Sequence, residues 1–157
     1  MTKNELFHMS KTRLPIGTIL ECRGFPFVEI KVEEILSNVR PNNCIGRESS
    51  IFMSASRDAC KKGLIFDEGY LHVVEPIGRV EKRDINWIKE LQLRHHRNSI
   101  FHKKVDPALK NISDEEIANR YWQGISSAVA EWEYVSAAAR VIELVSESPI
   151  TIHPKLI

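Results

Sequence analysis

The stretch Tyr70-Leu71-His72-Val73-Val74-Glu75 is the strongest strand signal in this chain of 157 residues. Its tyrosine and two valines suit an extended, pleated backbone. Pro76 and Gly78 come next and are typical of a turn. The stretch therefore predicts a β-strand near the middle of the chain.

Further strands are predicted on both sides of this one. Each is a short apolar run bounded by turn-forming or polar residues, as strands commonly are. The segments are residues 6–9, 18–22, 50–54 and 139–145. Strands are therefore expected towards both ends of the chain.

Helices are predicted between the strands. Apolar residues recur at helical spacing over residues 27–39, and a cap serine and a closing glycine bound a short helix over residues 56–63. Asp84 can cap a third helix, and Ser113 opens a capping box before a fourth that should end at Gly124. The apolar residues expected on these last two helices are Trp87, Ile88, Leu91, Ile117, Tyr121 and Trp122. Helices interleaved with strands predict an α+β fold with a mixed or mostly antiparallel sheet.

Charge and composition are those of a globular protein. Lys and Arg number 22, Asp and Glu number 21, the net charge is +1, and 43% of the residues are hydrophobic. The length suits one domain over residues 1–157. A disordered chain would be less hydrophobic and more strongly charged. The balance of charge also argues against a protein that holds nucleic acid by bulk positive charge.

The cysteines and the apolar runs predict a compartment. Three cysteines at unequal spacings form no zinc motif and no complete set of disulfide pairs, so free thiols in a reducing compartment are expected. No stretch approaches the roughly 20 apolar residues of a membrane span, and the first residues do not resemble a signal peptide. A cytoplasmic protein without a membrane segment is expected.

The first candidate site is Glu131-Trp132-Glu133. If the backbone is extended here, side chains two residues apart point to the same face, and both carboxylates line one surface. Two neighbouring carboxylates raise each other's proton affinity, or divide the stabilising of positive charge and the positioning of a nucleophile between them. The alternative is a solvated loop with two surface glutamates.

Polar residues in or beside the apolar strands are the second candidates. His8 lies in an apolar strand, where it is either a core histidine with an internal partner or a donor to a ligand hydroxyl. Ser50 and Ser54 flank the strand around Phe52, and their hydroxyls can bind each other, a backbone group or a ligand. Capping of the strand ends is the plainer reading of both serines.

A basic stretch over residues 91–105 contains no acid. Arg94, Arg97, Lys103 and Lys104 could contact phosphate or an acidic partner surface. A solvated helix end followed by a loop is the alternative. The stretch also holds an adjacent pair of histidines, which lacks the spacing that puts two metal ligands on one helical face, so no metal site is expected. No P-loop, GxGxxG or GxSxG motif is present, which disfavours a kinase, a Rossmann oxidoreductase and an α/β-hydrolase.

Taken in order, several motifs resemble the ADP-ribosyltransferase superfamily. The first half of the chain is similar to the rifamycin-modifying ADP-ribosyltransferases, through a strand with a histidine, a leucine-x-x-glycine turn, an aromatic strand running into a helix, and a strand that ends in Glu-Pro-x-Gly. The matching segments are Phe7-His8-Met9-Ser10, residues 14–20, residues 51–59 and residues 70–78.

The second half is similar to the actin-modifying binary toxins. Glu131-Trp132-Glu133-Tyr134-Val135, followed by Ala139-Arg140-Val141-Ile142, resembles their E-x-E loop running into a strand. The run Tyr121-Trp122-Gln123-Gly124 with Glu133-Tyr134 is also similar to a small bacterial family of unknown function. Three positions depart from these patterns: Phe52 stands where the rifamycin-type enzymes have a tyrosine, Arg83 where their acidic catalytic residue falls, and His8 where the toxins have an arginine.

The resemblance implies an ADP-ribosyltransferase-like fold, with a mixed or antiparallel sheet core, flanking helices and a helical insertion. It implies NAD as co-substrate and a bond between nicotinamide and ribose that breaks through an oxocarbenium-like transition state. Glu133 would stabilise the ribose cation, and Glu131 would position or deprotonate a protein or small-molecule acceptor. His8 would bind the adenosine ribose, Phe52 would pack on nicotinamide, and Ser54 or Ser50 would support the catalytic glutamate.

The activity expected on this basis is mono-ADP-ribosylation by a toxin, an effector or a modifying enzyme. Two alternatives stay open. The chain could be a binding module that has the fold but, with Phe52 and Arg83, no activity. It could also be a protein that contacts the phosphates of nucleic acid through its basic stretch.

Overall fold

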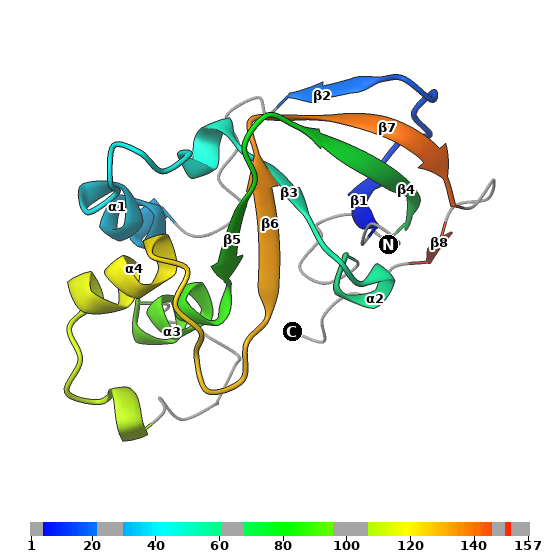
Figure 1. Cartoon of the computed structure of the whole chain (residues 1–157). Helices are drawn as coiled ribbons and strands as arrows, with labels where there is room; N and C mark the ends of the chain where they lie inside the picture. Colours follow the sequence, from blue (N-terminus) through cyan, green and yellow to red (C-terminus); the bar gives the residue numbers. More distant parts are fainter. Residues whose placement is uncertain (1–4, 22–29, 61–67, 96–106, 146–149, 152–157) are drawn as a thin grey trace.

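The computed structural model describes residues 5–21, 30–60, 68–95, 107–145 and 150–151 (Figure 1). Two β-sheets and a group of helices make up this part of the chain, so the predicted α+β class is confirmed. Each strand pairing in it is antiparallel. Within the same residues, no helix combines the length and the apolar character needed to cross a membrane.

The first sheet is built around its longest strand. The strand order is β1-β4-β7-β2, and β8 pairs with β4. These strands are β1 (Leu6–Ser10), β2 (Ile19–Glu21), β4 (Glu68–Ile77), β7 (Ala138–Leu144) and β8 (Ile150–Thr151). The strand predicted at residues 70–75 is confirmed as part of β4, and those predicted at 6–9, 18–22 and 139–145 overlap β1, β2 and β7.

The second sheet has the order β3-β6-β5. Its strands are β3 (Ile51–Met53), β5 (Glu81–Asp84) and β6 (Trp132–Ser136). The strand predicted at residues 50–54 is confirmed by β3, whereas β5 was not expected. Phe52 lies opposite Val135, and Arg83 lies opposite Glu133. Because side chains alternate along a strand and opposed residues share a face, Phe52, Glu133 and Arg83 lie on one face of this sheet.

One two-stranded ladder runs through both sheets. In the first sheet β4 pairs with β7 as far as Ile77 and Ala138, and in the second β5 pairs with β6 from Glu81 and Val135. The ladder bends at Gly78, whose φ of +83° is a conformation that glycine adopts without strain, and at Ala137 on the other strand. A second link joins the sheets where Phe7 and Ser54 exchange backbone hydrogen bonds of 2.8 and 3.0 Å.

Three helices pack together beside the second sheet (Figure 1). They are α1 (Ile30–Asn38), α3 (Asn86–His95) and α4 (Asp114–Trp122). Their shared core consists of Val32, Leu36, Trp87, Ile88, Leu91, Ile117, Ala118, Tyr121 and Trp122. All six apolar residues predicted for the third and fourth helices are therefore buried. Because α3 and α4 both lie between β5 and β6, the chain leaves the sheet ladder to form them and then returns.

The helix boundaries follow local signals. Ser113 caps α4, since its Oγ accepts the N–H of Glu116 at 3.1 Å, and Gly124, with a φ of +69°, follows the helix end. The predicted short helix is present as α2 (Arg57–Cys60), and α1 lies within the predicted residues 27–39. Residues 22–29 and 61–67 lie outside the described part.

Asp84 connects the end of β5 to two other segments. Its side chain is fully buried, and Oδ1 accepts the N–H groups of Asn86 at 3.0 Å and Glu131 at 3.1 Å. Oδ2 accepts the N–H of Ser127 at 2.7 Å. The expected cap at Asp84 is therefore part of a wider set of bonds that also fixes the segment leading into β6.

His72 lies on β4 opposite His8 on β1, inside the first sheet. Its side chain is fully buried, and Nε2 accepts the N–H of Leu14 at 3.1 Å. Burial lowers the pKa of His72, and its neighbour His8 lowers it further. Burial also lowers the pKa of His8. Burial therefore favours the neutral form of both rings.

We expect Asp84→Asn to destabilise the protein by about 3 kcal/mol, because bonds from buried N–H groups to a charged acceptor are each worth roughly 1.5–3 kcal/mol. Urea unfolding measures the loss. Glu116→Gln, an exposed acid on α4, should cost less than about 1 kcal/mol and serves as the control. Equal effects of the two substitutions would contradict the role given to Asp84.

Acid is expected to destabilise the first sheet through its two histidines. A histidine with a lowered folded pKa contributes stability above the unfolded value of 6.5, and that stability is lost as the pH falls through the folded pKa. Gln at position 72 can still accept the Leu14 N–H but does not titrate. The melting temperature of His72→Gln should therefore fall less than that of the wild type between pH 7 and pH 5. An unchanged acid response in His72→Gln would count against this account.

Candidate functional site

A buried ionic cluster lies between the helices and the second sheet. It consists of Glu33 on α1, Arg47 in a 3₁₀ turn (Arg47–Ser49), Glu81 and Arg83 on β5, Tyr121 on α4 and Glu133 on β6. Buried ionisable groups with unusual partners are concentrated at functional sites. Within the described residues, no group of three or more His, Cys, Asp or Glu side chains is placed to hold a metal ion.

Arg47 is fixed by two helices. Its Nε donates to both carboxylate oxygens of Glu33, at 3.0 and 3.1 Å, and its Nη1 donates to the Tyr121 hydroxyl at 2.8 Å. The guanidinium carbon lies 5.0 Å from the centre of the Phe52 ring. Nη1 also lies 3.9 Å from Glu133 Oε1. Arg47 therefore contacts both Phe52 and Glu133.

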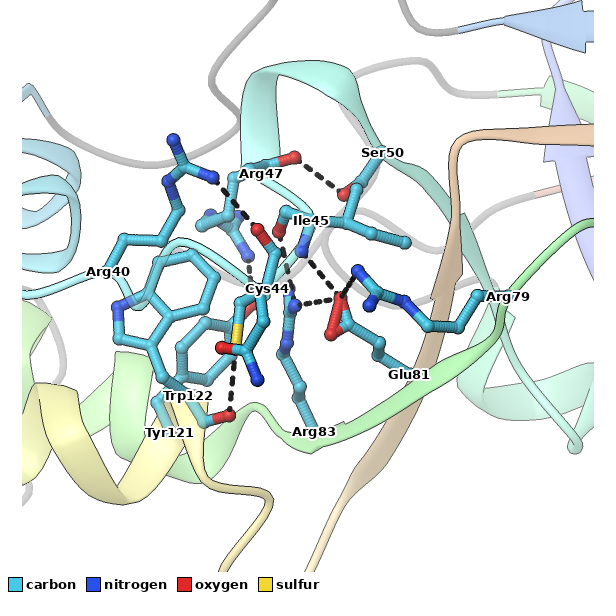
Figure 2. A network of polar contacts seen from close by, with 12 residues as sticks. Arg40, Cys44, Ile45, Arg47, Ser50, Arg79, Glu81, Arg83, Tyr121 and Trp122 are labelled. Atoms are coloured by element: carbon cyan, nitrogen blue, oxygen red, sulfur yellow. Dashed lines mark hydrogen bonds and ion pairs between the residues drawn. The ribbon is translucent and has the colours of Figure 1, made fainter.

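Arg83 is the largest fully buried side chain of the described residues. Its Nη2 donates to Glu81 Oε1 at 2.7 Å and to the carbonyl of Ile45 at 3.1 Å (Figure 2). Its guanidinium lies 4.6 Å from the centre of the Trp122 ring. Nε and Nη1 have no hydrogen-bond partner among the described residues. The ion pair and the ring contact therefore compensate only part of the cost of burying this charge.

Glu81 joins strand β5 to the loop that precedes Arg47 (Figure 2). Its Oε1 accepts the N–H of Ile45 at 2.6 Å in addition to the bond from Arg83, and Arg79 lies 3.8 Å away. Glu81 therefore binds the loop before Arg47 to strand β5.

Glu133 is an acid of this cluster whose pKa is changed by its surroundings. Its side chain is 24% exposed, yet Oε1 is buried and has no hydrogen-bond partner among the described residues. Burial raises its pKa to about 7; Arg47 and Arg83 oppose the rise and Glu33 adds to it. Glu133 therefore exchanges a proton near neutral pH, a property that general acid–base catalysis requires.

The structure places His8 beside the backbone of Phe52. His8 Nδ1 lies 3.0 Å from the Phe52 carbonyl oxygen, which can only accept, so Nδ1 carries the proton. His8 therefore contacts Phe52 through the Phe52 carbonyl, and Arg47 lies between the Phe52 ring and Glu133.

The two serines have local backbone partners. Ser50 Oγ donates to the Gly46 carbonyl at 2.7 Å, and Ser54 Oγ accepts the N–H of Ser56 at 3.1 Å. These are the bonds of a strand-end cap, as in the plainer of the two readings. Both serines flank β3, and each lies two residues from Phe52 in the chain.

Glu131 and Glu133 have different partners. Glu131 Oε2 pairs with Lys89 Nζ of α3 at 2.6 Å, and about a third of its side chain is exposed. Glu133 instead faces Arg47 and Arg83. The extended backbone expected here is present from Trp132 onward, but the two carboxylates do not form one pair.

The basic stretch contributes to internal packing at its described end. Arg94 donates to Glu90, Asp114 and the carbonyls of Leu109 and Ile112, and so ties α3 to the start of α4. These bonds occupy the side chain that was expected to contact phosphate. Arg97, Lys103 and Lys104 lie outside the described residues.

Sequence reasoning missed most of the ionic cluster. Arg47, Glu33 and Glu81 carry no motif, and Arg83 was noticed only as a departure from a family pattern. Tyr121 was predicted as a core residue, which it is, but its hydroxyl also binds Arg47. One available signal was the run Glu81-Lys82-Arg83-Asp84, whose alternation places Glu81 and Arg83 on one side of a strand.

Glu133→Gln is expected to stabilise the protein more at pH 8 than at pH 5. An acid with a raised folded pKa contributes stability below the unfolded value of 4.5, and that contribution is lost as the pH rises through about 7. Gln stays neutral, so the difference in melting temperature from the wild type should grow with pH. Glu131→Gln is the matched control and should show no such growth. A constant difference for Glu133→Gln would contradict the raised pKa.

No model of a known protein family matches this chain, and no significantly similar sequence was found among curated proteins.

Proposed function

We propose that this chain is an NAD-dependent mono-ADP-ribosyltransferase with an ADP-ribosyltransferase-like fold, acting in the cytoplasm as a toxin, an effector or a modifying enzyme. The observation that carries the proposal is the contact of Arg47 with both Phe52 and Glu133. Through Arg47 the carboxylate expected to face the ribose and the ring expected to face nicotinamide belong to one cluster.

Glu133 has the properties that the reaction requires of its charge-stabilising group. The reaction would break the bond between nicotinamide and ribose in bound NAD. Positive charge develops on the ribose as that bond breaks. A carboxylate held in a partly buried site stabilises such charge more strongly than one in water. The Glu133 side chain is 24% exposed, so a bound ribose could reach part of the carboxyl group while Oε1 stays buried.

The two arginines have a definite role in this proposal. Burial favours the protonated form of Glu133, which could not stabilise a cation. Arg47 and Arg83 lower the pKa of Glu133 against this effect of burial. They therefore keep a useful fraction of Glu133 ionised at neutral pH.

The remaining residues of the proposed site are assigned by chemistry. His8 donates through Nδ1 to the Phe52 carbonyl, so its neutral ring presents Nε2 as an acceptor for a hydroxyl of the adenosine ribose. Phe52 packs on nicotinamide. Glu131, more exposed and paired with Lys89, receives the protein or small-molecule acceptor. Ser50 and Ser54 support the site indirectly, by fixing the two ends of β3.

The proposal is tested by incubating the protein with NAD and measuring released nicotinamide. Glu133→Gln should lower the rate about a hundredfold to a thousandfold, as loss of one charge-stabilising group does. The wild-type rate should rise with pH through about 7, because Glu133 becomes ionised there. Glu116→Gln, an exposed acid on α4, is the control and should leave the rate unchanged.

Absence of nicotinamide release by the wild type would overturn the proposal. Calorimetry with NAD then distinguishes the two alternatives. NAD binding without nicotinamide release indicates the inactive binding module. Nucleic-acid binding that weakens steeply with salt indicates the third alternative, although Arg94 is already bonded within the protein.

A further inference from the structure

We infer that Arg47 is the positioning residue of the proposed site, holding Glu133 and Phe52 in the arrangement that the reaction needs. This inference rests on the proposed function. It concerns a residue outside every motif on which that function was predicted.

The guanidinium of Arg47 has little freedom to move. Glu33 on α1 accepts from Nε with both oxygens, and Tyr121 on α4 accepts from Nη1. The side chain is 8% exposed. Bonds from two helices therefore hold the Arg47 guanidinium in place.

The guanidinium of Arg47 lies near both site residues. It lies 5.0 Å from the centre of the Phe52 ring, the distance of a cation–aromatic contact. Its Nη1 is 3.9 Å from Glu133 Oε1, close enough for an ion pair but longer than a hydrogen bond. Arg47 thus attracts Glu133 without occupying its buried oxygen through a hydrogen bond.

The geometry depends on a planar, forked cation. Lysine keeps the positive charge, but an ammonium cannot bind Glu33 and Tyr121 in the same plane while covering an aromatic ring. Arg47→Lys should therefore preserve the ionisation of Glu133 and lose its positioning. Arg47→Met removes the charge as well.

The charges around Glu133 set the expected direction of its titration. The groups that face it are Arg47 from the 3₁₀ turn, Arg83 from β5, Glu33 from α1 and Tyr121 from α4. Without Arg47, burial and Glu33 both favour the protonated form, and only Arg83 opposes them. The pKa of Glu133 should then rise above about 7.

The experiment combines two measurements on the full chain. Carboxyl ¹³C NMR of labelled glutamate follows the titration of Glu133, whose signal is assigned by its loss in Glu133→Gln. Nicotinamide release gives kcat, KM and the pH profile. Arg120→Lys is the matched control, because Arg120 also pairs with a glutamate, at 3.3 Å, and lies over the Trp87 ring, at 5.3 Å.

Arg47→Lys is expected to lower kcat about tenfold to a hundredfold, in line with the effect of small misplacements on reaction rate. Its KM should change less than threefold, and the titration midpoint should stay near 7. In Arg47→Met the NMR midpoint and the pH profile should both move upward by a pH unit or more. The control variant should change none of these values.

Unchanged kcat in Arg47→Lys would overturn the inference, as would an unchanged NMR midpoint in folded Arg47→Met. If Arg47→Met does not fold, Arg47→Lys alone tests the inference: a lower kcat with an unchanged NMR midpoint supports it, and an unchanged kcat contradicts it. If the wild type releases no nicotinamide, the proposed function fails and the positioning role fails with it. The NMR midpoint of Arg47→Met then shows separately whether Arg47 controls the ionisation of Glu133.

Discussion

The ion pair between Arg83 and Glu81 is the interaction on which the junction of helices and second sheet depends. Arg83 lies in β5, and its guanidinium lies against rings of α4, so the charge is enclosed where an apolar side chain would ordinarily pack. Burying a charge costs several kcal/mol unless it is well paired. Glu81 and the Ile45 carbonyl supply part of that pairing, through Nη2 of Arg83, and in doing so fix the loop that carries Arg47. The placing of the site therefore follows from the burial of this one cation.

The parts of the fold that were predicted correctly are those with local causes. The strand at β4 is rich in residues that favour extended backbone, and α4 has both its cap at Ser113 and an apolar face. Strand β5 was missed because all four of its residues are charged, and a strand is usually recognised by its apolar residues. What stabilises β5 is distant in the chain: Asp84 binds N–H groups 43 and 47 residues away. No local pattern contains that information.

The residues of the candidate site also differ in whether a local sequence pattern could identify them. Glu133 and Phe52 were selected from motifs, and the structure connects them through Arg47. Arg47 itself could not be selected, because its partners Glu33 and Tyr121 are 14 and 74 residues away and meet it only after the helices have packed. The raised pKa of Glu133 also has a tertiary origin, since burial and Glu33 on α1 raise it while Arg47 and Arg83 oppose the rise. Sequence therefore indicated Glu133 as the candidate group, whereas its environment required the tertiary structure.

The ladder shared by the two sheets has a consequence for how the protein can evolve and be divided. Glu133 lies four residues before Ala137, and Arg83 lies five residues after Gly78, so the proposed site is built on the continuation of the first sheet's own central strands. Cutting the chain at this bend would separate Ile51 and Met53 of the second sheet from Val74, Ala139 and Val141 of the first, with which they form one core cluster. Helices α3 and α4, by contrast, lie between β5 and β6 in the chain and form an insertion in the ladder. Loops among them can change in length or sequence while the strands that carry Arg83 and Glu133 keep their register.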